Sequence, residues 1–441
     1  MKKIAASVGL IALGASTLHA AETSTLNSMQ QTKPWSISAT LRGFYDDNTE
    51  AVPDGPGKTE SSGFEITPSL RYGVVGEQTS FNVGYDFTAR YFDKQAPGRT
   101  DKSDYTHVFN ADLSHAFSPH MELTAGESFV IGQEPDLLRD PAGVAQPIEG
   151  SNIRNFANVG LTMDVTELLG FSFGYNNGFY DYDDEAPLFV GTTVGIPSNS
   201  GLYDRMEHAV RLDSRWKLQP QTTGVIGYTY SQTDYSGAQP IAGNTAIAPG
   251  TPGGYVMSDF RNSVGHRFYV GADQIFSSTL SGTVRAGVEY TDYANDPLGT
   301  SQWSPYFEGS LTYMFQTTTA LSAGVRYNRT AANDAGGAGN TFVRDTQTGS
   351  LYVSLKQALA AKMFLTANAT AQNSIYNAPG NVNYDNESYL FYQLGLDLSY
   401  EFNPNLSAHV GYNYDKFDTT VPGLTTDYDR NRVYLGVTAG F

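Results

Sequence analysis

The chain from Trp35 to Phe441 repeats one pattern: two strands of alternating apolar and polar residues, a tight turn between them, and a long polar loop after them. In the last strand, Val433, Leu435 and Val437 alternate with polar or small residues up to the terminal Phe441. Side chains of a strand point alternately to two faces, so each strand has one apolar and one polar face. In hydrocarbon every backbone N–H and C=O needs an internal partner, so such a sheet crosses a membrane only when it is closed. The pattern predicts an all-β fold, a transmembrane antiparallel up-and-down β-barrel.

About eighteen strands fit this alternation. Short turns such as Gly76-Glu77-Gln78 and Asn403-Pro404-Asn405 alternate with long connections such as Gln133 to Ser151 and Ser236 to Asp259. Outer-membrane barrels place short turns in the periplasm and long loops outside, whereas a soluble sandwich has no reason to alternate loop length. We expect strand starts near Trp35, Gly63, Thr79, Asp104, Met121, Asn152, Gly170, Asp204, Thr222, Arg261, Thr279, Gln302, Thr318, Ser350, Lys362, Glu387, Leu406 and Arg430.

The first twenty residues have the features of a secretory signal. Lys2 and Lys3 supply the charge, an apolar run follows, and Leu18-His19-Ala20 offers a small-residue cleavage site. A membrane anchor is the alternative, but the run is short and no stop-transfer pattern follows. Beyond it, no stretch approaches the roughly 20 apolar residues of a membrane helix. We therefore expect a signal peptide at 1–20, a short periplasmic lead-in at 21–34, the barrel at 35–441, and export to the bacterial outer membrane.

Composition narrows the choice of partners. The chain has 45 Asp and Glu against 27 Lys and Arg, for a formal charge of -18, which argues against nucleic acid as a partner. It has no Cys and therefore no disulfide framework. Aromatic residues collect beside the short turns, where rings with one wet edge settle at the headgroups, so outer-membrane lipid is an expected partner. Examples are Phe117, Phe276, Phe315, Phe402 and Phe441.

Strand parity assigns many charged residues to the polar, inward face. A barrel of this width holds an aqueous passage unless a loop intrudes, and Arg or Lys facing lipid at the midplane costs about 2–4 kcal/mol. The signs are mixed, which predicts cross-strand pairs in the wall and no simple anion or cation filter. The predicted pore-lining residues are Arg42, Arg71, Asp86, Arg90, Asp112, Glu122, Asp164, Arg211, Asp213, Arg215, Lys217, Arg267, Asp273, Arg285, Glu289, Glu308, Arg326, Lys356, Asp397 and Asp415.

Two inward groups each have a functional and a structural interpretation. The run Glu207, Arg211, Asp213, Arg215 and Lys217 fits either a constriction for an anionic or sugar solute or a salt-bridge ladder that braces the wall. Inward aromatic rings fit either sugar stacking or the filling of gaps near the rims; they are Phe44, Tyr269, Tyr306, Tyr352, Phe391 and Tyr434.

Enzyme chemistry finds little support. His115 follows Ser114, but neighbours in a strand point to opposite faces and cannot form a catalytic pair. No nucleophile elbow, zinc-protease motif or phosphate-binding loop occurs in the sequence. Asp46-Asp47-Asn48 and Asp183-Asp184-Glu185 offer oxygen ligands for Ca²⁺, but neither has the spacing of a calcium loop, which favours solvated loops. We expect neither an enzyme nor a metal or cofactor.

Two stretches carry a family resemblance. Leu41-Arg42-Gly43-Phe44-Tyr45-Asp46-Asp47-Asn48 resembles the first strand, with its Tyr-Asp-x-Asn ending, of the bacterial family called putative beta-barrel porin 2. Ile66-Thr67-Pro68-Ser69-Leu70-Arg71-Tyr72 resembles the Pro-Ser-Leu second strand of the same family. The resemblance implies an outer-membrane barrel. Because some relatives lie in exopolysaccharide secretion systems, it also implies a polysaccharide conduit with a periplasmic polysaccharide export protein as partner.

These features together predict an outer-membrane, porin-like channel for polar solutes, with exopolysaccharide export as a further role. One alternative is a general diffusion porin for small nutrients, which predicts trimers and a loop such as Ser236 to Asp259 folded into the lumen. The other is a plugged structural or adhesive barrel whose outer loops bind a surface partner.

Overall fold

The computed structural model describes residues 34–55, 57–95, 101–132, 151–183, 187–236, 239–315, 319–424 and 426–441. The predicted signal peptide and residues 21–33 of the lead-in lie outside these ranges. So do residues 133–150 of one long loop, the turn Gln316-Thr317, and Asp184 with Glu185.

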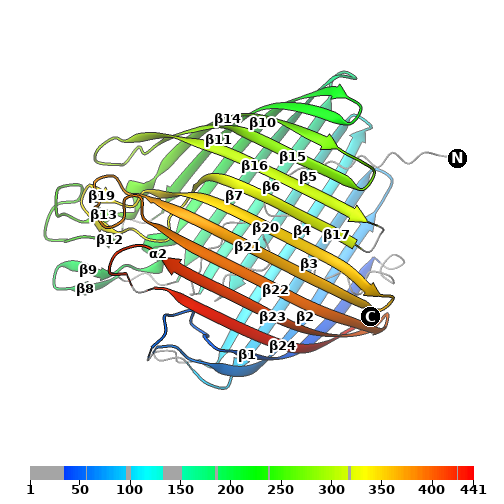
Figure 1. Cartoon of the computed structure of the whole chain (residues 1–441), viewed down its shortest axis with the longest axis horizontal. Helices are drawn as coiled ribbons and strands as arrows, with labels where there is room; N and C mark the ends of the chain where they lie inside the picture. The colour runs from blue at the N-terminus through cyan, green and yellow to red at the C-terminus, as the bar shows by residue number, and fades with distance from the viewer. Residues whose placement is uncertain are drawn as a thin grey trace.

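Eighteen strands form one closed antiparallel sheet (Figure 1). Each pairs with the strand before and after it, and the last, β24, pairs with β1. The predicted fold class and strand number are confirmed. The strands are β1 (Trp35–Asp46), β2 (Ser61–Val75), β3 (Thr79–Phe92), β4 (Ser103–Ser118), β5 (Met121–Gly132), β6 (Asn152–Asp164), β7 (Leu169–Tyr182), β10 (Arg205–Gln219), β11 (Thr222–Tyr235), β14 (Ser263–Ile275), β15 (Leu280–Asp292), β16 (Ser301–Phe315), β17 (Thr319–Thr330), β20 (Asp345–Ala360), β21 (Met363–Asn377), β22 (Ser388–Asn403), β23 (Leu406–Thr419) and β24 (Tyr428–Gly440).

The two ends of the barrel differ. Short turns and the C-terminus lie at the right of Figure 1, and the long connections lie at the left. In the described ranges, the structure has no helix with the length and hydropathy of a membrane span. The long connections carry small elements of their own: β8 (Leu188–Val190), β9 (Thr193–Ile196), α2 (Asn199–Tyr203), β12 (Pro240–Ala242), β13 (Val256–Met257), the 3-10 helix η2 (Ser258–Arg261), β18 (Gly337–Ala338) and β19 (Thr341–Phe342).

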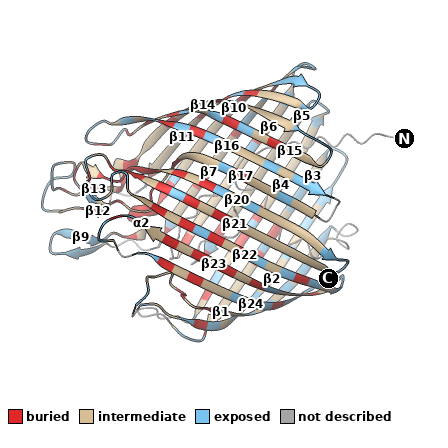
Figure 2. Ribbon diagram, viewed as in Figure 1, coloured by how far each residue is buried: buried red, intermediate tan, exposed pale blue. Residues whose placement is uncertain are grey.

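The wall separates an apolar outside from a polar inside. In β1, Ile37 and Leu41 on the outer face are 50% and 56% exposed, while Arg42 on the inner face pairs with a carboxylate of β2. Register extends this alternation around the sheet, because directly opposite residues of paired strands share a face. Figure 2 shows exposed and more buried residues alternating along the strands.

Glycines let inward tyrosines lie flat along the wall. Tyr269 is directly opposite Gly227, and a Cβ at Gly227 would lie 2.2 Å from its ring. Tyr434 is opposite Gly411 in the same way, with a distance of 2.1 Å. Because the neighbouring strand offers no side chain at these points, the rings lie against its backbone.

The end of β1, which carries the family resemblance, stabilises the seam where β1 pairs with β24. Asp46 at the end of β1 forms a buried ion pair with Arg430 of β24 at 2.6 Å. Asn48 is fully buried, and its side-chain amide donates to the carbonyls of Val52 at 2.7 Å and Asp429 at 3.0 Å. Chain segments about 380 residues apart are thus joined by charge and hydrogen bonds.

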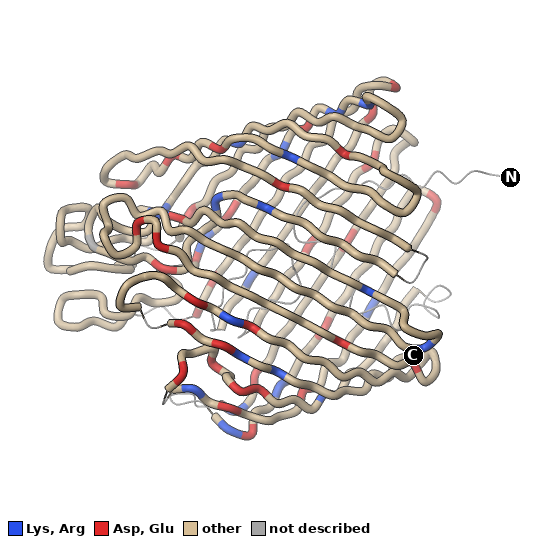
Figure 3. Tube along the Cα trace, viewed as in Figure 1, with Lys and Arg blue, Asp and Glu red and all other residues tan. Residues whose placement is uncertain are grey.

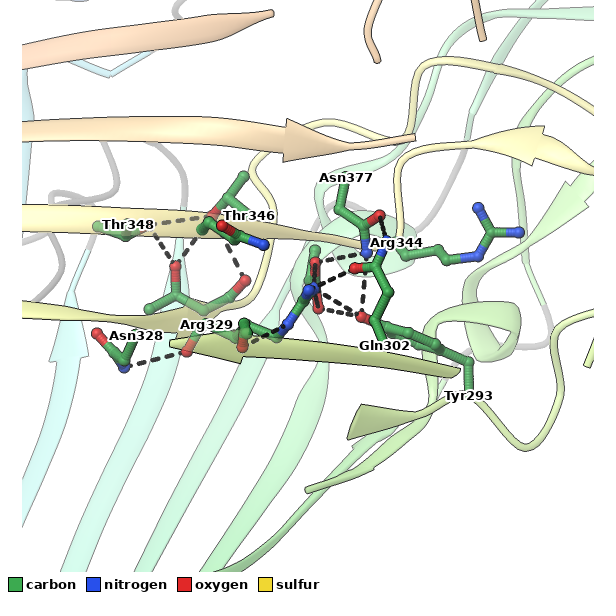
Figure 4. Close-up of polar contacts among 12 residues, drawn as sticks. Tyr293, Gln302, Asn328, Arg329, Arg344, Thr346, Thr348 and Asn377 are labelled. Carbon is green, nitrogen blue, oxygen red and sulfur yellow. Dashed lines mark hydrogen bonds and ion pairs between the residues drawn. The ribbon is translucent and has the colours of Figure 1, made fainter. Parts of the chain in front are cut away.

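A second polar cluster joins the strands where β16 and β17 separate. Their pairing stops at Phe307 and Tyr327, although both strands continue toward the long-loop end. Arg329 sits at this point and donates to both carboxylate oxygens of Asp345, at 2.7 and 2.9 Å (Figure 4). Tyr293 also donates to Asp345, so the cluster holds β17, β20 and the loop after β15 together.

Candidate functional site: the barrel interior and its mouth

All of the predicted pore-lining residues lie on the interior face of the wall by strand register. Figure 3 shows the two signs of charge interspersed along neighbouring strands. That these residues line a permeation path stays a prediction. The interior positions follow from the pairings of β1–β7, β10, β11, β14–β17 and β20–β24.

In the first strands, acidic residues bridge basic ones. Glu65 lies directly opposite Arg42 on one side and Arg90 on the other, at 3.5 and 3.0 Å. Arg71 donates through Nη2 to both carboxylate oxygens of Asp86 at 2.7 Å. Opposite charges facing each other across strands stabilise a sheet by about 0.2–1 kcal/mol per pair. Glu65 was not among the predicted lining residues, although its position between the outward Phe64 and Ile66 already indicated an inward side chain.

The same arrangement continues on the other side of the barrel. Arg267 of β14 pairs with Glu289 of β15 at 3.0 Å, and Arg285 of β15 pairs with Asp273 of β14 at 2.5 Å. Further round, Glu308 of β16 faces Arg326 of β17 with 3.8 Å between their charged atoms. Positive and negative groups therefore pair along the wall, and the ion selectivity of the interior stays a prediction.

The charged run on β10 forms a ladder. Arg211 pairs with Asp213 at 2.9 Å, Lys217 reaches Asp164 of β6 at 2.7 Å, and Arg215 approaches Asp273 at 3.8 Å. Glu207, at the other end of the run, pairs with the buried Arg205 at 2.6 Å. The side chains brace the wall, as the structural interpretation of this run predicts.

Three long connections pack together over the mouth and form what we call the loop layer, residues 187–204, 239–262 and 331–344. Their apolar side chains share one buried cluster with Tyr182 at the end of β7. Tyr203 of α2 donates to the carbonyl of Asn333 at 2.8 Å, which links connections that leave the wall six strands apart. Figure 1 shows these connections gathered at one end of the barrel. The clustered residues of the loop layer are Leu202, Tyr203, Ile241, Ala242, Val256, Ala335 and Phe342.

Close backbone contact requires glycine within this layer. Gly339 has a φ of +61°, and its N–H donates to the carbonyl of Gly254 at 2.7 Å. A Cβ at Gly339 would lie 2.0 Å from the carbonyl oxygen of Thr251. The connections after β11 and β17 therefore touch backbone to backbone.

Two buried arginines hold the loop layer in place. Arg261 donates to the carbonyls of Gly201 and Leu202 at 3.2 and 2.7 Å, and burial lowers its pKa. These carbonyls at the end of α2 lack helical partners, so a cation there is favourable. Arg344 donates through Nε to Asp296 at 2.8 Å. Burial alone would raise the pKa of Asp296, but hydrogen bonds from Arg344 and Thr300 outweigh it and hold that pKa below its ordinary value.

The loop layer changes the interpretation of the inward rings. Phe391 is completely buried, within a cluster that includes Ala332 and Val343 of the loop layer, so it offers no face to a solute. Tyr269 and Tyr306 are only 4% and 5% exposed, and they bond to the wall carboxylates of Asp213 and Glu308. The three other predicted rings, Phe44, Tyr352 and Tyr434, are half-buried.

The groups considered for catalysis or metal binding are engaged elsewhere. Ser114 faces inward and donates to Glu122 at 2.7 Å, whereas His115 faces outward beside Phe117. Asp46 binds Arg430, as described for the seam. Across the parts of the chain that the structure describes, no three His, Cys, Asp or Glu side chains gather as they would around a metal ion.

A closed eighteen-stranded barrel with an apolar exterior and a charged interior is the fold of a porin-like channel of the bacterial outer membrane. The chain belongs to the family described as putative beta-barrel porin 2, whose profile matches residues 36–441. The predicted family is therefore confirmed.

Several solved structures have a similar fold. Outer membrane protein opdK from Pseudomonas aeruginosa shares 11% identity with a TM-score of 0.44, covering 92% of this chain and 99% of its own. A BenF-like porin from Pseudomonas fluorescens Pf-5 shares 10% identity with a TM-score of 0.44, covering 93% and 99%. OccK9 (OpdG) from Pseudomonas aeruginosa shares 13% identity with a TM-score of 0.42, covering 92% and 98%. No curated protein matches the chain.

Proposed function

We propose that this protein is a passive channel through which small polar solutes cross the outer membrane. The observation that carries the proposal is the interior wall, where acidic and basic side chains pair across strands from β1 to β17. Eighteen strands enclose more space than wall side chains fill, so water occupies the interior. A wet, largely self-neutralised wall lets polar solutes pass without a deep binding site.

The charge pattern predicts weak ion selectivity. Paired charges cancel much of each other's field, so neither sign of solute meets a strong barrier. The whole chain nevertheless has 45 acidic against 27 basic residues, and this excess favours cations modestly.

The structure at the mouth of the barrel favours small solutes over a polymer. The loop layer spans part of the opening and is fixed by a buried apolar cluster and by buried arginines. Export of a polysaccharide, with a periplasmic export protein as partner, rests on the family resemblance. Because Phe391, Tyr269 and Tyr306 are buried, half of the predicted rings give no track for sugar stacking. We therefore favour small solutes as the cargo. The barrel itself reaches the outer membrane after cleavage of its signal peptide, residues 1–20.

Liposome swelling tests this proposal. Purified, folded protein should admit small neutral sugars into liposomes, with a rate that falls as solute size rises. Replacing residues 240–257 by a short Gly-Ser linker should raise the size limit because it removes β12 and β13 from the loop layer. Deleting the hairpin 188–196 removes backbone hydrogen bonds to this segment but no residue of the buried cluster, so it should raise the size limit less.

The loop layer also favours a second candidate, a sealed barrel whose loops bind a surface partner. Absence of swelling with the intact chain, together with swelling after the deletion of 240–257, would support this candidate and overturn passive transport by the intact protein.

A further inference from the structure

Glu127 of β5 occupies an unusual place on the outer wall. It lies directly opposite Ala111 of β4 and Ala157 of β6, and both alanines share the outer, lipid-facing side with their strands' apolar residues. Among the described residues, Glu127 is the one acidic or basic residue that strand register places on the outer face near the middle of the wall. The other outward charges, such as Asp181, Asp234 and Asp292, lie at the long-loop ends of their strands.

The depth of Glu127 follows from its neighbour β4. The outward residues of β4 include His115 and Phe117 near the short turn, and Tyr105 and His107 near the long-loop end. Such rings mark the two headgroup levels. Ala111 lies halfway between them, and Glu127 is its direct neighbour. The carboxylate is therefore at the level of the lipid chains.

No described residue satisfies this carboxylate. Glu127 makes no hydrogen bond or ion pair within the ranges that the structure describes, and alanines flank it on both neighbouring strands. An ionisable group facing lipid at this depth is costly and normally has a protein partner. Small residues let two walls approach closely inside a membrane. The outer face of β3, β4 and β5 thus has the features of an interface.

We propose that this face binds a second copy of the chain, related by a two-fold axis along the membrane normal that passes beside Ala111. Such an axis keeps every residue at its own depth and brings β5 of one copy against β3 of the other. Glu127 then faces whatever the second copy presents on β3 at the same depth.

That residue is Tyr85. It lies opposite Phe109 on β4, while Glu127 lies opposite Ala111, so Glu127 is two strands further round and two residues nearer the short turns. Going from β3 toward β16, rows of opposite residues climb to the long-loop end: the row that starts at Phe81 ends at Trp303.

Tyr85 and Glu127 lie at nearly the same depth in the membrane. With strands about 4.8 Å apart, a rise of about 3.3 Å per residue and a tilt of about 40°, the two strand steps raise Glu127 by about 6 Å and the two residues lower it by about 5 Å. Tyr85 and Glu127 therefore have the same depth to within about 2 Å, and each copy offers both groups.

The hydroxyl of Tyr85 has the right surroundings for this contact. Tyr85 is 39% exposed on the outer wall, and its oxygen lies 2.9 Å from Nδ1 of His107. When Nδ1–H of His107 donates to that oxygen, the O–H of Tyr85 donates to Glu127 of the second copy. Because of the two-fold symmetry, this row of hydrogen bonds from His107 through Tyr85 to Glu127 forms twice, so the interface is self-complementary.

Cross-linking tests the position of the axis. The chain has no cysteine, so Ala111→Cys introduces a single thiol beside the axis, where two Cα atoms come within the roughly 7 Å that a disulfide allows. Mild oxidation of outer membranes should give a band of dimer mass. Leu435→Cys, on the outer face of β24 and 66% exposed, is the matched control and should stay monomeric.

Association measurements test the chemistry. In analytical ultracentrifugation of the full chain in micelles, Glu127→Leu and Tyr85→Phe should each raise the dimer Kd at least tenfold, and the double variant should add little. Tyr228→Phe, which removes a similar outward pair with His266 at 2.8 Å, should leave the Kd unchanged. A monomeric or trimeric wild type, equal cross-linking at residue 435, or cross-linking of residue 111 only to a different protein would each overturn the proposal.

Discussion

The closing seam allows a quantitative test of how the barrel is held shut. Arg430 and Asp46 pair at 2.6 Å with side chains 5% and 4% exposed, so Arg430→Met leaves a buried carboxylate without its cation. Breaking a buried pair in this way costs about 3–5 kcal/mol. Asp46 keeps the backbone N–H of Asn48 at 3.0 Å, which offsets about 1 kcal/mol of that loss. We therefore expect the free energy of unfolding to fall by about 2–4 kcal/mol.

Urea unfolding of the protein in lipid vesicles, followed by tryptophan fluorescence, measures this change. Arg215→Met is the control, because Arg215 and Asp273 are 3.8 Å apart and 32% and 26% exposed, and it should cost less than about 1 kcal/mol. The double variant Asp46→Leu, Arg430→Met removes both charges and should recover part of the loss. If Arg430→Met costs no more than the control, the buried pair does not hold the seam closed.

Three further predictions concern the interior and the mouth. Gly227→Val pushes the ring of Tyr269 off the wall, because a Cβ would lie 2.2 Å from it, and should cost about 1–3 kcal/mol and lower single-channel conductance. Glu289→Gln leaves the positive charge of Arg267 without its carboxylate at 3.0 Å and should shift reversal potentials toward anions; an unchanged potential would argue against a lumen-facing pair. Asp296 has a lowered pKa, so its stabilising contribution is present above the unfolded value of about 4 and is lost as pH falls through the folded pKa. The protection factors for hydrogen exchange in 331–344, which correct for the intrinsic pH dependence of exchange, should thus be high at pH 5 and fall below about pH 4, whereas in Asp296→Asn they should be low at both pH values.

The strand pattern could be predicted from the sequence wherever one face of a strand is apolar. Expected starts at Trp35, Thr79 and Met121 coincide with the observed ones. β20 begins at Asp345, five residues before the expected Ser350. Its first residues are polar or glycine on both faces, so no alternation marks them, and pairing with β17 and β21 keeps them in the sheet.

The loop layer could not be predicted in the same way. Ile241, Val256 and Phe342 are single apolar residues among Gly, Pro and Thr, with no period that indicates a partner. Their burial arises from contacts between connections far apart in the sequence. Phe391 was therefore placed on the inner face by parity, but the segment that covers it had no sequence signal.

The proposed channel requires water inside the barrel and lipid around its outer wall. Planar-bilayer recording of single-cysteine variants at adjacent residues of β20 tests it most directly, because Ser354 faces inward and Val353 outward. We predict steady conductance for both variants and a drop on adding a charged, water-soluble thiol reagent for Ser354→Cys alone. No conductance, or a reagent that reacts at residue 353 and spares residue 354, would show that the barrel is not a water-filled channel with this orientation of its wall.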